Sequence, residues 1–394
     1  MGDSQKEDRV KYLQQLLEKT KIDAAFITLS RDLFYYTGTA QPCIFIVTSD
    51  DHRLLVRRAH DFVYNETFID KTKIRPKGSS RDAIDTLLEM GVPKGKIGME
   101  LDVIPATLFL KMKEIYGDYD LVDISKYILN QRMTKDETEI KAIQQACHIM
   151  DMGHQRVMET LHPGMTELEL AAEIEYAHRK AGHEGILSMR QFDFYISRGP
   201  LSAGKNLFRV SGFANTITGI GQSAAVPAGP SNTKINAGDL VITDIPTCYH
   251  GYHSDQTRTY ILGKPSDAVT DLFLKIREIS DQAIFSLKDG ITCKGLFEIT
   301  YAKAQKLGVA EYFLGIDPRK GNFIGHGIGL DANEAPILFW NSDFQLRNNF
   351  VLTIEVHLTH PEFGAVKLED VVLVKNDGCE VLSITPRELF EISI

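Results

Sequence analysis

The stretch VITDIPTCYHGYHSDQTRT, residues 241–259, decides the fold because it pairs two aspartates across a turn. Asp244 precedes a turn-rich segment and Asp255 follows it, eleven residues after the first aspartate. The flanks, residues 239–244 and 252–261, are β-prone and partly alternate between apolar and polar side chains. Such flanks around a turn predict a hairpin, which brings both carboxylates to one end of a sheet.

A second acidic pair repeats this arrangement later in the chain. Glu355 lies in VLTIEVHL, and Glu369 follows fourteen residues later in AVKLEDVVLV. Residues 351–358 and 365–374 have the composition of strands, and the turn PEFG joins them, so we expect a second hairpin. Side chains on a strand alternate between its two faces, so ligands and core residues can share one strand.

A histidine between the two pairs completes a set of metal ligands. His326 lies in FIGHGIGLD, where flanking glycines would let an ion approach the backbone closely. A lone acidic residue at a strand end is usually a solvated surface residue, but burying several carboxylates together is very costly without a cation. Carboxylates with an imidazole suit two divalent ions, Mn, Co, Fe or Zn with Mn or Co favoured, which can activate water.

Length and composition narrow the class of protein. The chain has 394 residues, 43% of them hydrophobic and 25% charged, and its net charge of −9 comes without a basic patch. We therefore expect a globular protein with two domains and no nucleic-acid partner. No apolar stretch is long enough to span a bilayer, and the N-terminus is too polar for a secretory signal. Five widely spaced cysteines, without a CxxC pair, favour reduced thiols in the cytoplasm.

The pattern of helices and strands divides the chain near residue 130. The first part alternates helical and strand-like segments and carries no motif with chemistry of its own. Two capping boxes, at 134–137 and 166–169, predict helices that run to about 161 and 182. The segments expected before residue 130 are helices at 9–20 and 81–90, and strands at 24–29, 44–48, 54–57 and 97–100.

A weak internal echo spans the second part. Gly164 and Thr166 with Leu170 and Gly182 recur at a constant offset of 126, as Gly290, Thr292, Leu296 and Gly308. A true repeat predicts two related halves around one site, with the aspartates from the first half and the histidine and glutamates from the second. The alternative is that these matches arose by chance.

At these motifs the chain resembles the creatinase, prolidase and methionine aminopeptidase family, the M24-type metallopeptidases with the pita-bread fold. SRDLFYYTG looks like the family's N-terminal signature, MTKDETEIKAIQQA looks like the opening helix of its catalytic domain, and both ligand spacings match. The resemblance covers nearly the whole chain and is closest to Xaa-Pro dipeptidases and aminopeptidase P. It implies an α/β (α+β) protein: a creatinase-like α/β domain at 1–130 and a pseudo-two-fold pita-bread catalytic domain at 131–394.

The resemblance also implies roles for the residues that match. Asp244, Asp255, His326, Glu355 and Glu369 correspond to the ligands of a dinuclear metal centre, Asp255 and Glu369 as bridging ligands. Glu355 would also be the acid/base beside a hydroxide held by both ions. The implied enzyme is a homodimeric, metal-dependent hydrolase of small Xaa-Pro peptides.

Two departures from the family pattern bear on the substrate. Proline-specific members carry a second histidine seven positions after the metal histidine, where this chain has Asn333. Another family histidine, in a stretch like SALPH, is replaced by Ala228. These histidines are thought to hold the scissile carbonyl, and losing such help can cost about 10²–10³ in rate.

Other residues could take over this work. His253 lies two positions before Asp255 and His357 two positions after Glu355, so on regular strands each shares a face with its ligand. We hypothesise that one of them contacts substrate; the alternative is that both are structural. Arg258 and Asn333 are candidates for substrate contact, although Arg258 could instead form an ion pair that orients a ligand. Segment 189–214 should line the cleft through Arg190, Phe192, Phe194, Tyr195 and Arg198.

Three functions remain open from the sequence. The first is the Xaa-Pro peptidase. The second keeps the metals but acts as a hydrolase or lyase on a small non-peptide metabolite, which the replaced histidines favour. The third is a non-catalytic binding protein on a peptidase scaffold, which is the weakest of the three because every metal ligand is retained.

Overall fold

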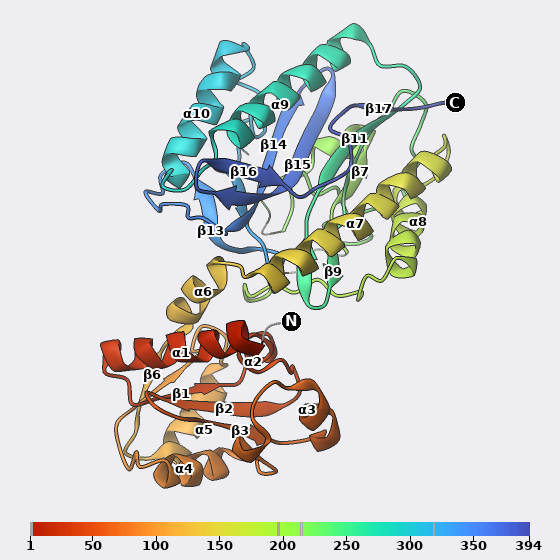
Figure 1. The fold of residues 1–394 in the computed structure, drawn as a ribbon. Coiled ribbons are helices and arrows are strands. Elements are labelled where there is room, and N and C mark those ends of the chain that lie inside the picture. The colour runs from red at the N-terminus through yellow and green to blue at the C-terminus, as the bar shows by residue number, and fades with distance from the viewer. Residues whose placement is uncertain (1–2, 195–197, 213, 215, 318–319) are drawn as a thin grey trace. The chain divides into compact units, whose positions relative to one another are not determined.

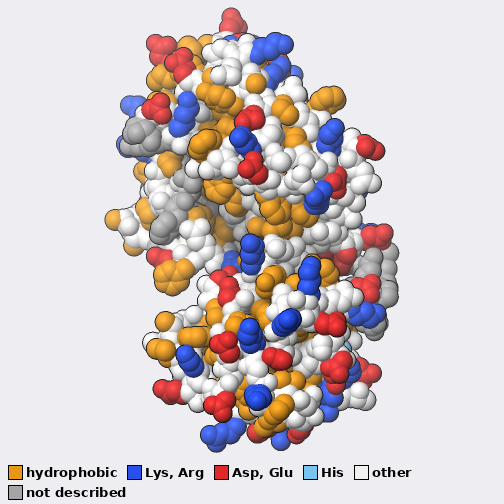
Figure 2. Space-filling view, turned by 90° about the vertical axis from the view of Figure 1, so that its left-hand side faces the viewer, with side chains coloured by type: hydrophobic (Ala, Val, Ile, Leu, Met, Phe, Trp, Pro, Cys, Tyr) orange, Lys and Arg blue, Asp and Glu red, His pale blue; other side chains and the backbone are white. Residues whose placement is uncertain are grey.

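The computed structural model describes residues 3–194, 198–212, 214, 216–317 and 320–394. The chain separates into two compact units, residues 1–131 and 132–394. No helix within the described residues combines the length and the apolarity that a membrane crossing demands. On the face drawn in Figure 2, Lys and Arg side chains are interspersed with Asp and Glu side chains.

The first unit is a mixed sheet with helices around it, as its alternating sequence pattern predicts. The strand order is β4-β3-β2-β1-β5-β6. The first helix begins at Asp3, six residues before its predicted start, and the other expected segments form within two residues of their predicted ends. Its core packs side chains such as Phe26, Ile44 and Leu87. Its elements are α1 (Asp3–Thr20), β1 (Ala24–Ile27), α2 (Ser30–Thr37), β2 (Cys43–Thr48), β3 (His52–Val56), α3 (His60–Glu66), η1 (Lys71–Lys73), β4 (Ile74–Arg75), α4 (Ser80–Glu89), β5 (Lys96–Met99), α5 (Ala106–Tyr116), β6 (Asp120–Asp123) and α6 (Ser125–Met133), whose last residues enter the second unit.

The second unit is built on a large sheet with the order β13-β12-β14-β15-β11-β8-β7. Helix α9 packs along β14 and β15, and helix α7 packs on the small hairpin of β9 and β10 (Figure 1). The elements are α7 (Glu137–Thr160), α8 (Glu167–Lys180), β7 (Leu201–Ala203), η2 (Gly204–Phe208), β8 (Leu240–Asp244), β9 (Thr247–Tyr249), β10 (Tyr252–Ser254), β11 (Thr257–Leu262), α9 (Asp267–Ser286), α10 (Cys293–Lys306), β12 (Phe323–Gly327), β13 (Glu334–Phe339), β14 (Val351–His360), β15 (Gly364–Lys375), β16 (Gly378–Val381) and β17 (Phe390–Ile392).

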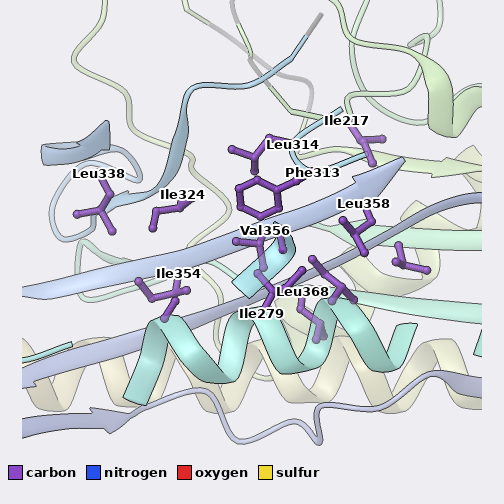
Figure 3. Packing of buried hydrophobic residues seen from close by; sticks show 14 of the residues in the cluster. Ile217, Ile279, Phe313, Leu314, Ile324, Leu338, Ile354, Val356, Leu358 and Leu368 are labelled. Atoms are coloured by element: carbon purple, nitrogen blue, oxygen red, sulfur yellow. The ribbon is translucent and has the colours of Figure 1, made fainter. Parts of the chain in front are cut away.

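The core of the second unit lies between the sheet and its helices. Ile354 and Val356 on β14 and Leu368 on β15 pack with Ile279 on α9 (Figure 3). These residues occupy alternate positions on their strands, so the intervening side chains point to the opposite face of the sheet. The apolar face therefore anchors the two strands and leaves their other face available for polar groups.

The internal echo corresponds to two helix pairs with matching starts. Thr166 is the N-cap of α8 and accepts a hydrogen bond from the backbone N–H three residues on, and Thr292 does the same for α10. Leu170 and Leu296 are fully buried at equivalent positions. The matching anchors therefore lie at equivalent positions of α8 and α10.

One capping assignment from the sequence is wrong. Asp136, rather than Thr134, caps α7: its carboxylate accepts from the N–H groups of Thr138 and Glu139, and the Glu139 carboxylate accepts from the N–H of Asp136. Thr134 lies two residues before the N-cap, and its backbone pairs with Phe350 in an isolated β-bridge. The helix still ends where the pattern predicts.

Candidate metal centre

Three strands of the large sheet, β8, β15 and β14, carry candidate acidic ligands, and β11 lies between β8 and β15. Asp244 on β8 lies opposite Thr257 on β11, Thr257 also lies opposite Glu369 on β15, and Glu369 lies opposite Glu355 on β14. Asp255 follows β10, in the link that leads into β11. Both predicted hairpins therefore form, although the first contains the smaller hairpin of β9 and β10 within it.

His326 reaches this row from β12. Its Nδ1 lies 3.0 Å from the carbonyl oxygen of Gly327, and its Nε2 lies 3.8 Å from Glu355 Oε1. The flanking glycines serve the packing of strands rather than the approach of an ion. Gly325 has a φ of +150°, and a Cβ there would overlap the carbonyl oxygen of Thr353 on the neighbouring strand.

The donor set fits a divalent cation. Donor atoms of Asp255, His326 and Glu369 lie within 4.8 Å of one another, and these side chains are at most 9% exposed. Asp255 Oδ1 and Glu369 Oε1 are buried, with no hydrogen-bond partner among the described residues. Burial and the nearby carboxylates raise the pKa of Asp255 well above its ordinary value, and burial raises the pKa of Glu369 to about 8. A cation at these oxygens would remove both the desolvation cost and the repulsion between carboxylates.

Lys367 is a buried cation among the same carboxylates. Its Nζ lies 2.6 Å from Asp244 Oδ2, 2.9 Å from Glu355 Oε2 and 3.3 Å from Glu369 Oε2. Burial alone would lower the pKa of Lys367, but the three carboxylates hold it well above its ordinary value. Burial alone would raise the pKa of Glu355, yet Lys367 brings it below its usual range. Both groups are therefore charged at neutral pH.

Two further residues hold Glu369 in place. Thr257 Oγ1 donates to Glu369 Oε2 at 2.8 Å. Arg258 donates from Nη1 to the carbonyl oxygen of Glu369 at 2.8 Å and from Nη2 to Asp370 Oδ1 at 2.6 Å. Arg258 is only 1% exposed and does not line the cavity described below, so the structure does not support its proposed contact with substrate. The orienting alternative fits better, although the ion pair is made with Asp370 and not with a metal ligand.

A cavity of about 210 Å³ opens onto the candidate ligands. Asp244, Asp255, His326, Glu355 and Glu369 line it together with Asn333, which is exposed at its edge. Its apolar wall consists of Met189, Phe194, Phe323, Ile337 and Phe339. The volume is below the roughly 300–1,000 Å³ of sites for drug-sized ligands, so the cavity suits a small substrate.

Segment 189–214 lines the cavity, as the sequence predicted, through Met189, Gln191, Phe194, Pro200 and Ala214, but within the described part of the segment only one of the side chains singled out from the sequence is among them. Phe194 lines the cavity, whereas Arg190, Phe192 and Arg198 do not. Phe192 is 92% exposed. Tyr195 lies outside the described residues.

The two histidines proposed to contact substrate are placed elsewhere. His253 Nε2 accepts from the N–H of Ser188 at 3.1 Å, and His253 Nδ1 lies 3.0 Å from the carbonyl oxygen of Gly329. Both ring nitrogens are therefore occupied by backbone groups, and burial lowers the pKa of His253. His357 is 4% exposed, and burial lowers its pKa to about 4. Neither residue lines the cavity, so the proposed role in substrate contact is not supported for either.

The replaced histidine positions differ from each other. Asn333 lines the cavity, so its side-chain amide can face a substrate. Ala228 is buried at 3% exposure and is not part of the cavity wall. Of the two departures from the family pattern, only Asn333 keeps a polar group at the site.

Sequence reasoning missed Lys367 and Thr257, although each left a signal. Lys367 interrupts an apolar strand two positions before Glu369, which places both side chains on the same face. Thr257 follows Asp255 by the same interval. The contacts themselves depend on β8, β14 and β15 lying side by side, which local spacing does not encode.

The fold and the site define an α/β protein whose second unit carries a carboxylate-rich cluster of candidate metal ligands. The metallopeptidase family M24 matches residues 141–376, and the creatinase/prolidase N-terminal domain matches residues 9–134. The chain belongs to metallopeptidase family M24, which implies divalent metal ions as cofactors.

Relatives of known name agree with this membership over nearly the full length of the chain. A Xaa-Pro dipeptidase from Pyrococcus horikoshii is 27% identical over 387 residues, covering 97% of this chain and 98% of the relative. The structure of an X-Pro aminopeptidase from Thermotoga maritima matches with a TM-score of 0.78 at 25% identity, covering 97% of this chain and 99% of that one. A Xaa-Pro dipeptidase from Bacillus anthracis, at 23% identity, shares the fold with a TM-score of 0.82, covering 98% and 100% of the two chains.

Proposed function

We propose that this chain is a metal-dependent peptidase that cleaves the Xaa-Pro bond of small peptides. The observation that carries the proposal is the position of Glu355, a charged carboxylate that faces the cavity beside four other candidate ligands. The names of its relatives support proline as the residue after the scissile bond. Membership of a peptidase family favours an enzyme over the non-catalytic binding protein.

Asp244, Asp255, His326, Glu355 and Glu369 would hold the metal cofactor. The cofactor supplies Lewis acidity, which polarises a carbonyl group and makes water more acidic. Mn, Co, Fe and Zn all suit these donors, and Mn or Co is the proposed choice. Side chains of the protein itself would transfer the proton and contact the substrate.

Glu355 is placed to move a proton between water and the leaving nitrogen. Its Oε2 contacts Lys367 Nζ at 2.9 Å, which leaves Oε1, on the side of His326, to accept a proton from the attacking water. Because Lys367 lowers the pKa of Glu355, the carboxylate is ionised and ready to act as base at neutral pH. The same oxygen then returns the proton to the proline nitrogen as the peptide bond breaks.

Asn333 and the apolar wall would complete the site. The Asn333 amide can donate a hydrogen bond to a substrate oxygen, the task that a histidine performs in the family pattern. Phe323, Phe339 and Ile337 surround the space that a proline ring would fill and exclude water from it.

A second candidate is a hydrolase of small amides that lack a free carboxylate. No Lys or Arg occurs among the described residues that line the cavity. Among the described residues of the cavity wall, no basic side chain would pair with the C-terminal carboxylate of a dipeptide, and an unpaired carboxylate there is unfavourable. A longer Xaa-Pro peptide or a neutral non-peptide amide avoids this cost.

Turnover on a small panel of substrates tests the proposal. Purified protein with quantified metal content would receive Xaa-Pro dipeptides, Xaa-Pro-Xaa tripeptides and matched peptides with alanine in place of proline. Cleavage only before proline, with loss of activity in Glu355→Gln, supports the peptidase. Bound metal without cleavage of any peptide moves the assignment to the non-peptide amide.

We also propose a cellular compartment and an oligomeric state for the protein. All five cysteines are free, which supports a reducing compartment such as the cytoplasm. The family resemblance supports a homodimer, which light scattering on the purified protein would test.

A further inference from the structure

Lys367 lies where a second positive ion of the metal centre would be expected. The side chain is 1% exposed, and its ammonium group contacts oxygens of Asp244, Glu355 and Glu369 at 2.6, 2.9 and 3.3 Å. A lysine is rarely buried without anionic partners, and here three carboxylates supply them. The ammonium group therefore neutralises carboxylates that an ion would otherwise neutralise.

The carboxylate oxygens of the site divide into two groups. Asp244 Oδ2, Glu355 Oε2 and Glu369 Oε2 face Lys367. Asp255 Oδ1 and Glu369 Oε1 have no hydrogen-bond partner within the described residues, and Asp255, Glu369 and His326 form the cluster whose donor atoms converge. The oxygens of the first group already have the Lys367 ammonium group as a positive partner. The two oxygens of the second group have no such partner within the described residues.

The backbone keeps Lys367 in this position. Its N–H donates to Thr259 Oγ1 at 3.0 Å, and Thr259 Oγ1 donates in turn to its carbonyl oxygen at 2.8 Å. Lys367 also lies within the long ladder between β14 and β15, opposite His357. These main-chain contacts fix where the side chain of Lys367 begins, and its ammonium group would compete with any ion for the oxygens that it contacts.

We propose that the ammonium group of Lys367 replaces one of the two divalent ions, so that this chain binds a single ion at Asp255, His326 and Glu369. An ion held by Asp244, Glu355 and Glu369 would lie within a few ångströms of the ammonium nitrogen, and the two positive charges would repel each other. Lys367 then fixes the orientation of the Glu355 carboxylate through their 2.9 Å contact. This inference rests on the metal centre of the proposed function, but its test counts ions rather than turnover.

The wild-type protein gives the primary test. Metal-free protein would be incubated with excess Mn²⁺, passed through a desalting column and analysed for manganese per chain, with electron paramagnetic resonance on the same sample. We expect one Mn²⁺ per chain and the six-line spectrum of an isolated ion. Two ions with a spin-coupled spectrum would overturn the inference and leave the proposed function intact. No bound ion would overturn both.

The Lys367→Met variant adds a second test, with Lys375→Met on the same strand as its control. Met is close to Lys in length and apolar volume but has no charge, so we expect the number of Mn²⁺ ions per chain to rise from one to two. Lys375 pairs with Glu380 at the surface, and its substitution should leave one ion. A folded Lys367→Met protein that still binds one ion would contradict the inference, and if the variant does not fold, the wild-type count decides.

Discussion

Glu355 lies directly opposite Glu369 across β14 and β15, and His357 lies opposite Lys367 one step further along the same face. The opposite face of the two strands carries Ile354, Val356 and Leu368, which pack into the core. The hairpin of β14 and β15 therefore packs into the core through one face, and its other face carries candidate ligands of the site. The register of the two strands brings Lys367 within 2.9 Å of Glu355 and 3.3 Å of Glu369.

Glu355→Gln should abolish most of the activity while leaving the fold intact. The amide keeps the shape of the side chain but cannot accept a proton, so we expect kcat/KM to fall by about 10²–10⁴. Substrate turnover would be measured together with metal content, because Glu355 is also a candidate ligand. An activity loss without a loss of metal assigns proton transfer to this carboxylate.

Glu362→Gln is the matched control for this substitution. Glu362 is exposed in the turn between β14 and β15, so the same chemical change is made on the same hairpin away from the cavity. Its activity should equal that of the wild type. If Glu355→Gln also retains wild-type activity with full metal content, another group must accept the proton.

Arg258→Met should destabilise the protein rather than weaken substrate binding. The buried guanidinium group donates to the carbonyl oxygens of Thr257, Glu369, Thr385 and Pro386 and pairs with Asp370. Removing one partner of a buried pair usually costs about 3–5 kcal/mol, so chemical denaturation should show a loss of this size.

Arg347→Met provides the comparison for Arg258. The side chain of Arg347 is 54% exposed and pairs loosely with Asp289, so its loss should change the free energy of unfolding by less than about 0.5 kcal/mol. If Arg258→Met instead raises KM and leaves the free energy of unfolding unchanged, the result would support a contact between Arg258 and substrate.

The ligand hairpins could be predicted from sequence because turn residues and alternation are local signals. Glu355 and Glu369 needed only two strands and one turn to meet. The same alternation rule failed for His253 because β10 ends at Ser254, so His253 and Asp255 do not share one regular strand. The alternation rule correctly placed His357 on the face of β14 that carries Glu355. It did not predict whether His357 lines the cavity, because the same face also carries side chains that are buried beside the cavity.

Contacts between distant strands were beyond the reach of local patterns. Lys367 meets Asp244 across 123 residues, and nothing near either residue states that β8, β11 and β15 are neighbours. The sequence therefore named the candidate ligands but not Lys367, whose contacts depend on the order of the strands. The structure was needed to show which carboxylates the buried ammonium group of Lys367 contacts.

Removing the metal should make the stability of the protein fall as the pH rises. Burial raises the pKa of Glu369 from its ordinary 4.5 to about 8 in the ion-free site. Between these values the folded state holds a proton that the unfolded state has lost, so the stabilisation present below about pH 4.5 disappears as pH approaches 8. A bound ion takes the place of the proton, so its stabilising effect should grow over this interval.

Chemical denaturation at pH 6, 7 and 8 with either EDTA or Mn²⁺ checks this expectation. The difference between the two conditions should widen with pH, and an ion at 100 times its Kd contributes about 2.7 kcal/mol. Glu369→Gln should remove much of the pH dependence of the EDTA samples. A constant difference from pH 6 to 8 would contradict the assigned protonation of Glu369.

His178 should make the protein lose stability on the acid side of neutrality. It is 1% exposed on α8, and a methyl group at Gly153 on α7 would overlap its ring. Burial lowers the pKa of His178 to about 3, against about 6.5 in the unfolded chain, so below pH 6.5 the unfolded state binds the extra proton. The free energy of unfolding should therefore fall by up to about 1.4 kcal/mol per pH unit from this residue.

The test of His178 compares how steeply the free energy of unfolding changes with pH, and not its value at any one pH. Unfolding would be measured at pH 7.0, 6.5, 6.0 and 5.5 for the wild type, His178→Gln and His162→Gln, whose side chain is exposed in the same unit. Other buried histidines contribute to the wild-type slope, so only the difference between proteins is assigned. His178→Gln should be less dependent on pH than the wild type, and His162→Gln should match the wild type. Equal slopes in all three proteins would show that His178 takes up its proton in the folded state as readily as in the unfolded one.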